Sequence, residues 1–467
     1  MRFWSSLALV IFASATAFAQ PAKQVPPAPQ PAGPTFEAEL EALFVKDGLT
    51  ADQAAARAAG ASPTVRRAAA SIDIAVAQAE TAELTRVPRI GATATYTRLS
   101  PLDPLALGDP DMGAPVLTFT ENTYAVQGQL SIALSDYLVR YPKLISAARL
   151  GTEAARVSKR ASEIDAGQDA RLAYYEWVRS RLQVMVARRQ LTQVRGTLGQ
   201  VRALAQAQRV STADRMRVES QEAQAEQIVD QLENLADLRE EQLRLLIGAP
   251  AKQPLTIGED IRGDFVAPAA GELDALLGTA KQQRLEFQAL DAGIRAKEQQ
   301  LSAEKAALFP RLSAFANVDY ARPNQRVFPQ ADKFDLTWAA GLQLSWTFND
   351  TLVARANNKR ISAETRELRA DRENLERATR IAVLSAQQAV ALAQHALLTS
   401  QKGLVAAEES YRVRQALLAA QRATAVELVD AETELTRARI TALNARIDLR
   451  VATAQLGHAL GNDVPKR

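Results

Sequence analysis

The sequence predicts a mainly α-helical protein that also contains four amphipathic β-strands and is built as two copies of one unit. The clearest strand lies at 338–348, where apolar residues alternate strictly with small or polar ones, as in a strand with two different faces. The same alternation occurs at 124–134, and a very long helical pattern follows both strands. Leu130 corresponds to Leu344, and Leu138 to Leu352, at the same spacing, so the chain is a tandem duplication.

The two copies cover residues 36–248 and 271–461, and residues 249–270 connect them. Each copy is expected to run as helix, strand, loop, strand, long helix, turn and returning helix. In the first copy we expect strands at about 89–98 and 123–134, a long helix at about 138–207 and a returning helix at about 211–247. In the second copy we expect strands at about 311–320 and 336–348, a long helix at about 352–420, a returning helix at about 424–460 and then a tail at 462–467.

Matching prolines, Pro88 and Pro310, end a helix just before the first strand of each copy. Proline lacks an N–H group and disfavours helical geometry at the preceding residue, so an extended segment can begin there. The connections at 99–122 and 321–335 are rich in Pro, Gly, Asn and Asp, which predicts exposed loops. The proline-containing linker between the copies is expected to pack around the outside of the helices.

The N-terminus resembles a secretory signal peptide over residues 1–19. Arg2 supplies the positive charge, residues 7–12 supply the apolar segment, and Ala17 and Ala19 fit a small-residue cleavage site. Residues 20–35 are rich in proline and predict an extended leader. The mature chain is therefore expected to be exported across a bacterial inner membrane.

The two long helices are the largest predicted elements. At 1.5 Å per residue each would be on the order of 100 Å long, too long for an ordinary globular domain. Apolar residues recur every seventh position in the later helices, as at Leu428, Leu435 and Leu449, which predicts supercoiling against neighbouring helices. The sequence therefore indicates rods that pack together as a coiled coil.

The composition excludes several classes of function. The chain has no cysteine, which excludes disulfides, thiolate catalysis and cysteine-based lipid anchoring. The net charge is +3 with both signs mixed along the helices, so we expect no nucleic-acid partner. Neither His395 nor His458 has metal-ligand spacing, and no nucleotide or nucleophile motif is present. We therefore expect neither an enzyme nor a protein with a metal or other cofactor.

Membrane insertion is expected to occur through the strands. After the signal we expect no transmembrane helix, whereas strands of about ten residues are long enough to cross an outer membrane. Their apolar faces carry aromatic residues toward the strand ends, which predicts a membrane girdle of Tyr96, Tyr124, Tyr320, Trp338, Trp346 and Phe348. The opposite faces are polar and suit a water-filled lumen. Because four strands cannot close a barrel, several copies would have to share one.

The duplication, the two proline-bounded strand pairs and the long helices with their hairpin returns resemble the TolC-like outer membrane efflux proteins. The resemblance extends from about residue 36 to 461. It implies a homotrimer whose twelve-stranded transmembrane β-barrel lies in the lipid of a Gram-negative outer membrane and continues into a periplasmic α-helical barrel. It further implies a passive exit duct for efflux or type I secretion, which opens at its periplasmic tip and docks on a periplasmic adaptor and an inner-membrane pump.

The two helix-to-helix turns match each other and correspond to the periplasmic tip of that family. Gln208 and Arg209 align with Gln421 and Arg422, which the resemblance implies are tip and adaptor-contact residues. Ser211 and Thr424 are expected to be N-caps of the returning helices.

The acidic residues after these turns are the candidate gate. The resemblance implies that Glu427 and Asp430 form an acidic ring at the entrance. It also implies that Asp214 latches the tip to an arginine, for which Arg422 is the candidate, although Ala423 stands at the family's arginine position. The alternative is that Glu427 and Asp430 lie on a solvated helix face with intrahelical partners such as Arg437.

Two other functions remain open from the sequence. A periplasmic adaptor or structural coiled-coil protein without a barrel would explain the rods but not the two strand pairs. An exit duct for secreted proteins would have the same architecture as one for drug efflux.

Overall fold

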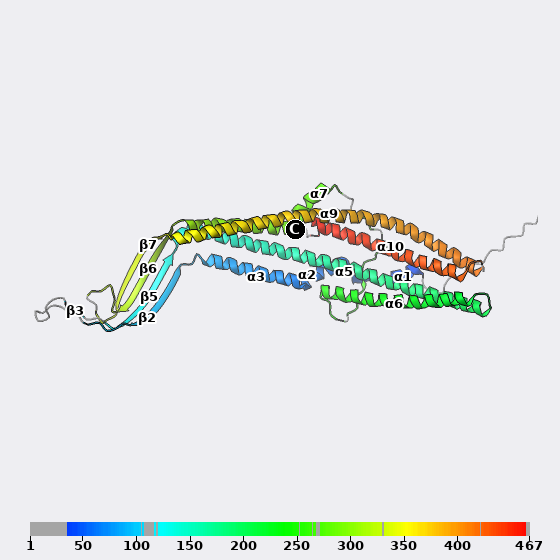
Figure 1. Ribbon diagram of the computed structural model, residues 1–467, viewed down its shortest axis with the longest axis horizontal. Helices are drawn as coiled ribbons and strands as arrows, with labels where there is room; N and C mark the ends of the chain where they lie inside the picture. Colours follow the sequence, from blue (N-terminus) through cyan, green and yellow to red (C-terminus); the bar gives the residue numbers. More distant parts are fainter. Residues whose placement is uncertain are drawn as a thin grey trace, which may run out of the picture.

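The protein is elongated, with a sheet at one end and two helical hairpins at the other (Figure 1). The computed structural model describes residues 35–103, 105–106, 116–117, 120–251, 253–263, 265–267, 271–328, 331–420 and 422–463. The predicted signal peptide and nearly all of the leader lie outside these residues, as do Gln421 and the end of the C-terminal tail.

Both copies contain a strand pair, a long helix and a returning helix, and the first copy contains additional short strands. The first copy contains α1 (Phe36–Ala42), β1 (Phe44–Leu49), α2 (Ala51–Ala61), α3 (Pro63–Leu84), β2 (Arg89–Arg98), β3 (Leu105–Ala106), β4 (Val116–Leu117), β5 (Asn122–Ile132), α4 (Leu134–Leu138), α5 (Arg140–Gln206) and α6 (Thr212–Ile247). The second contains α7 (Leu273–Gln283), α8 (Leu285–Lys305), η2 (Ala306–Leu308), β6 (Arg311–Arg322), β7 (Asp335–Ser345), α9 (Phe348–Ala419) and α10 (Ala425–Leu460).

The helical pattern begins earlier after the last strand than predicted. The strand expected at 336–348 ends at Ser345, and α9 starts at Phe348 rather than near residue 352. Asp350 lies in the first turn of α9, where a negative charge is favoured by the helix dipole. Trp346 and Phe348 therefore lie just beyond β7 and not within it.

The two strand pairs form one four-stranded antiparallel sheet in the order β2–β5–β6–β7. The second strand of the first copy pairs with the first strand of the second copy, so the sheet crosses the boundary between the copies. Its two outer strands, β2 and β7, each have one edge without a partner strand in the described part of the chain.

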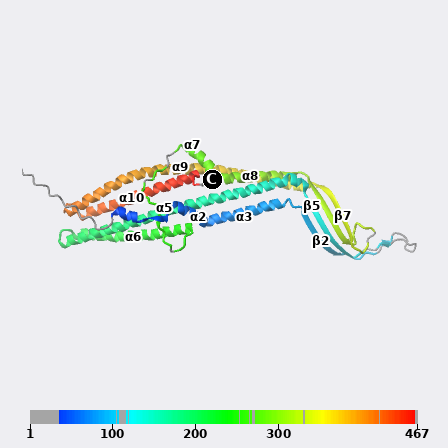
Figure 2. The same cartoon turned by 180° about the vertical axis from the view of Figure 1, so that it is seen from behind.

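The long helices follow the strands along the chain and run at an angle to the sheet as two antiparallel hairpins (Figures 1 and 2). Figures 1 and 2 show α5 beside α6 and α9 beside α10, with α3 and α8 alongside the sheet-proximal halves of α5 and α9. The long helices contain 67 and 72 residues, which at 1.5 Å per residue gives rods of roughly 100 Å. The predicted mainly helical fold with a small sheet is confirmed.

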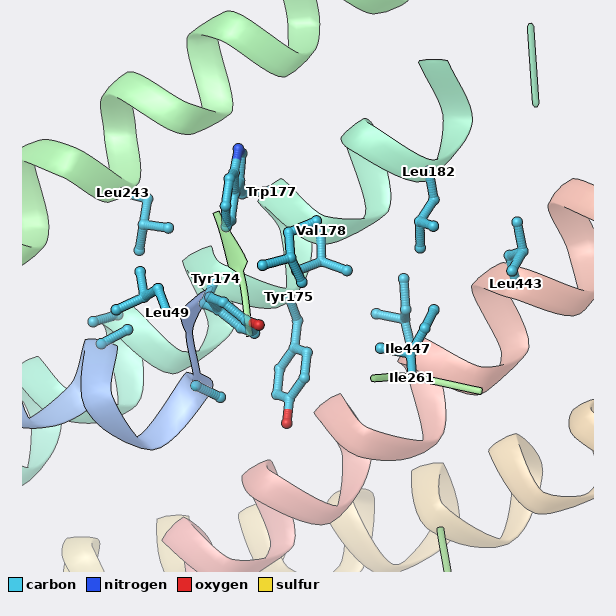
Figure 3. Close-up of a cluster of buried hydrophobic side chains, with 14 of the residues drawn as sticks. Leu49, Tyr174, Tyr175, Trp177, Val178, Leu182, Leu243, Ile261, Leu443 and Ile447 are labelled. Atoms are coloured by element: carbon cyan, nitrogen blue, oxygen red, sulfur yellow. The ribbon is translucent and has the colours of Figure 1, made fainter. Parts of the chain in front are cut away.

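The main core lies midway along the rods, where segments distant in sequence meet. Trp177 and Tyr174 of α5 are fully buried and pack with Leu243 of α6, Ile447 of α10 and Leu49 of β1 (Figure 3). Full burial of one large apolar side chain stabilises the folded state by about 1.5–3 kcal/mol. This cluster packs the α5–α6 hairpin against the α9–α10 hairpin.

The linker between the copies is partly internal, contrary to the expectation that it packs around the outside. Ile261 is fully buried in the main cluster, and Ile257 is buried beside it. The backbone of β1 holds this segment, because Leu49 N–H donates to Thr256 O at 2.8 Å and Gly258 N–H donates to Leu49 O at 2.8 Å. Gly48 and Gly258 lie so close that a Cβ on Gly258 would approach Gly48 O to 2.1 Å.

No long uncharged apolar run was expected after the signal, but α9 contains one. Residues 381–398 contain no charged side chain, and α9 is long and apolar enough by length and composition to cross a membrane. One side of this segment packs in the protein instead. Val383, Ala386 and Val390 are buried against Leu449 and Leu456 of α10.

Candidate functional site

The turn between α5 and α6 ends the helix with a left-handed residue that is not glycine. Gln208 has φ 57°, and the N–H groups of Gln208 and Arg209 donate to the carbonyl oxygens of Ala205 (3.0 Å) and Leu204 (2.9 Å). This is the pattern of a Schellman cap, at the position where glycine is usually favoured. In the second turn Arg422 N–H donates to Leu417 O at 2.8 Å, the equivalent bond.

Both returning helices begin at the predicted N-caps. Ser211 Oγ accepts from Asp214 N–H at 3.1 Å, and Thr424 Oγ1 accepts from Glu427 N–H at 3.2 Å. Each hydroxyl also donates to the carboxylate of that same acidic residue. Asp214 and Glu427 thus occupy the first turn, where they satisfy free helix ends.

The two candidate ring residues have partners on other helices. Glu427 forms an ion pair with Arg414 of α9, and Asp430 lies 3.8 Å from Arg217 of α6. Arg437, the partner named in the alternative, pairs with Glu434 instead. Asp430 therefore connects one hairpin to the other, while its side chain remains largely exposed.

The predicted latch pair is not in contact within this single chain. Asp214 accepts a hydrogen bond from Ser211, and no hydrogen bond or ion pair joins it to Arg422 among the residues that the structure describes. Arg209 and Arg422 both lie in the turns, at the end of the molecule opposite the sheet.

A buried carboxyl group near the tip is absent from the predicted site residues. Glu432 of α10 is 2% exposed, and its Oε1 accepts a 2.8 Å hydrogen bond from Thr197 of α5. Its Oε2 has no hydrogen-bond partner in the described part of the chain. Burial raises the pKa of Glu432 to about 7, because the charged form loses its hydration. Glu432 and the buried Arg439 are seven residues apart, which is one heptad. A search for charged residues at heptad spacing would have identified both as candidates for burial.

The sheet has two chemically different faces, as the register shows. Ile90, Leu130, Ala316 and Ala340 are aligned across the strands on one face, and Thr93, Gln127, Asp319 and Thr337 are aligned on the other. Large apolar side chains on the first face are exposed: Trp338 is 72% exposed, and Leu342 and Leu344 are each 70% exposed. A soluble protein rarely exposes such a continuous apolar surface.

The six girdle candidates form two groups at opposite ends of the sheet. At the loop end, the rings of Tyr96 and Tyr124 are 5.1 Å apart, and Tyr320 stacks on Phe334 at 4.9 Å. Trp338 lies near the same end of β7. At the helix end, Trp346 and Phe348 are 6.4 Å apart just after β7.

The polar face contains a recess of about 360 Å³ that extends along this face over all four strands. It is lined by backbone and side chains of all four strands and by Arg326 of the β6–β7 connection. No group of three or more potential metal ligands occurs among the described residues.

Comparison with solved structures identifies the same architecture throughout the chain. A membrane protein from Pseudomonas aeruginosa is 18% identical with a TM-score of 0.71, covering 96% of this chain and 98% of that one. The outer membrane protein VceC from Vibrio cholerae is 16% identical with a TM-score of 0.70, covering 88% and 96%. The open state of the MtrE outer membrane channel from Neisseria gonorrhoeae is 20% identical with a TM-score of 0.71, covering 89% of each.

Sequence comparison adds a match to part of the chain. No curated protein matches the chain. Residues 276–462 match the sequence model described as outer membrane efflux protein, and these residues include β6, β7 and the complete α9–α10 hairpin. The second copy therefore matches the outer membrane efflux protein family in sequence, and the whole chain shares the fold of the solved structures above.

Proposed function

We propose that this chain forms an outer-membrane exit duct, a passive conduit from the periplasm to the exterior in an efflux system. The observation that carries the proposal is the sheet with an exposed apolar face, a polar opposite face and helical rods that continue its strands. Lipid would cover the apolar face, and water and cargo would contact the polar one.

The open edges of β2 and β7 support assembly with further copies. An unpaired strand edge in hydrocarbon leaves N–H and C=O groups without partners, at a cost of several kcal/mol each. Pairing β2 of one copy with β7 of the next would remove both edges. The family resemblance favours three copies, which would give a closed barrel of twelve strands.

The helical hairpins would form the periplasmic part of the conduit. In this arrangement Glu427 and Asp430 of each copy would surround the entrance, and Asp214 and Arg422 would latch neighbouring hairpins. The turn residues Gln208, Arg209, Gln421 and Arg422 would face the adaptor, with the inner-membrane pump beyond it. The pair of Asp430 with Arg217 supports a role in holding the two hairpins together, and the pair of Glu427 with Arg414 joins the two helices of one hairpin.

A periplasmic adaptor or structural coiled-coil protein is the alternative, and the exposure of Trp338, Leu342 and Leu344 argues against it. A water-soluble protein of this kind rarely exposes a continuous apolar surface. An exit duct for secreted proteins has the same architecture. A deletion strain tested for drug sensitivity and for missing secreted proteins would distinguish these two cargos.

Gel migration and bilayer conductance together test the proposal. The full-length protein, expressed with its own signal and extracted from outer membranes in detergent, should migrate as an oligomer unless it is heated. The same material should conduct ions across a planar lipid bilayer. A protein recovered as a soluble single copy from the periplasm would overturn the proposal.

A further inference from the structure

The connection between β6 and β7 folds back against the sheet instead of extending away from it. Asn324 is 1% exposed, and its Nδ2 donates to Asp335 O at 2.9 Å and to Thr337 Oγ1 at 3.2 Å. Its Oδ1 accepts from Arg326 N–H at 2.9 Å. These bonds hold Arg326 at a fixed place next to the first residues of β7.

Arg326 is positioned over the polar face by its own side chain as well. Its Nη1 donates to Trp338 O at 2.8 Å, and the side chain lines the recess of about 360 Å³ together with Gln127, Asn317 and Asp319. The other guanidinium nitrogens have no protein acceptor among the residues described. A guanidinium held in this way can still donate hydrogen bonds to an anionic group in the recess.

The floor of the recess contains acceptors that are also unsatisfied. Asn317 Oδ1 and Asp319 Oδ1 have no hydrogen-bond partner within the described part of the chain. The register places Asp319 between Gln127 and Thr337 on the polar face. The recess thus presents a cation and an anion that are not paired with each other.

We propose that Arg326 and Asp319 form a second charge filter at the exterior end of the duct, separate from the tip. This inference rests on the proposed function, because only in a barrel does the polar face line a lumen. Repeated in each copy, the guanidinium groups would contact anionic groups of a passing solute and the carboxylates its cationic groups. Rings of charged side chains in a narrow pore set its ion preference.

Reversal potentials measured across a planar bilayer with a potassium chloride gradient test the filter. Arg326→Gln should shift the permeability ratio toward cations by about twofold, and Asp319→Asn should shift it toward anions. Both shifts should shrink at 1 M salt, where the screening length falls from about 10 Å to about 3 Å. Arg326→Lys should retain the wild-type ratio.

Lys333→Gln is the matched control, because it removes one positive charge from the same connection. Lys333 pairs with Asp335 at 3.4 Å and does not line the recess, so its loss should leave the ratio unchanged. Asp319 lies on a strand, so its opposite shift cannot arise from collapse of the connection. An unchanged ratio in conducting Arg326→Gln channels, or equal shifts in Arg326→Gln and Lys333→Gln, would overturn the filter. A wild-type protein that forms no channel would instead refute the proposed function.

Discussion

Gln208 is the only non-glycine residue with positive φ among the residues that the structure describes. A side chain at this left-handed position clashes with its own backbone, and glycine avoids the clash. The surrounding Schellman bonds hold the conformation despite this cost. The turn therefore stores a small amount of strain at the tip.

Gln208→Gly is expected to stabilise the protein by about 0.5–1 kcal/mol per copy, because the strain is relieved. Thermal unfolding followed by circular dichroism would measure the change. Gln200→Gly is the control, since Gln200 is exposed within α5, where glycine should cost about 1 kcal/mol. A lower unfolding temperature for Gln208→Gly would show that the turn needs the glutamine side chain.

Glu432 is expected to make stability depend on pH. Its pKa rises from 4.5 unfolded to about 7 folded, so the folded state holds the extra proton between these values. The contribution of Glu432 to stability should therefore be greatest below about pH 4.5 and should be lost as the pH rises through 7, a change of about 3 kcal/mol. Tyr411 is electrostatically coupled to Glu432, and burial raises the pKa of Tyr411 to about 12, far above this range.

Glu432→Gln should remove this dependence while preserving the bond from Thr197. Unfolding temperatures at pH 5 and pH 8 should converge in the variant and differ in the wild type. Glu434→Gln, on the exposed side of α10, should behave as the wild type. Parallel pH profiles for Glu432→Gln and the wild type would mean that water or relaxation solvates the carboxylate.

At the scale of elements, the strands and long helices were predictable from the spacing of their apolar residues. That spacing depends on which side of each element is buried or covered. The alternation at 338–348 and the heptads of α10 reflect contacts made along each element. β1 was not predicted, because its partner is the linker at Ile257, more than two hundred residues away. Gly48 and Gly258 could have hinted at a close backbone approach, but sequence does not show which glycines meet.

The site was only partly predictable for the same reason. The N-caps Ser211 and Thr424 followed from local chemistry. The partners of Glu427 and Asp430 come from other helices, and the burial of Glu432 depends on α5, so neither could be assigned from α10 alone. The position of Arg326 depends on how the connection between β6 and β7 folds. That connection is rich in turn residues and has no repeating pattern of apolar residues, so the position could not be predicted from the sequence.

The two tip turns also make the latch testable. If Asp214 and Arg422 pair between neighbouring copies, Asp214→Asn and Arg422→Gln should each raise single-channel conductance. The double variant should add little to either single change, because one interaction is lost in all three. Arg209→Gln, at the matching position of the other turn, is the control. Unchanged conductance in both single variants, or effects that simply add, would exclude this pair as the latch.

At the scale of the whole molecule, charged side chains occur at both ends of the elongated chain. The acidic residues Glu427 and Asp430 lie at the helical end, and Arg326 and Asp319 lie at the sheet end. Threefold repetition would place six carboxylates around the entrance. Such a ring attracts cations and repels anions where the passage is narrowest.

Glu427→Ala combined with Asp430→Ala should weaken block of the single-channel current by multivalent cations. The blocking concentration of a trivalent cation added on the tip side should rise by about tenfold. The substitutions also remove the contacts with Arg414 and Arg217, so conductance itself should increase as the hairpins separate.

Glu434→Ala is the control for this prediction. It removes a negative charge from the same helix, but its partner Arg437 is on that helix as well. It should leave both block and conductance unchanged. Cation block of wild-type strength in the double variant would place the constriction elsewhere, because a ring that has lost all its carboxylates cannot bind a trivalent cation.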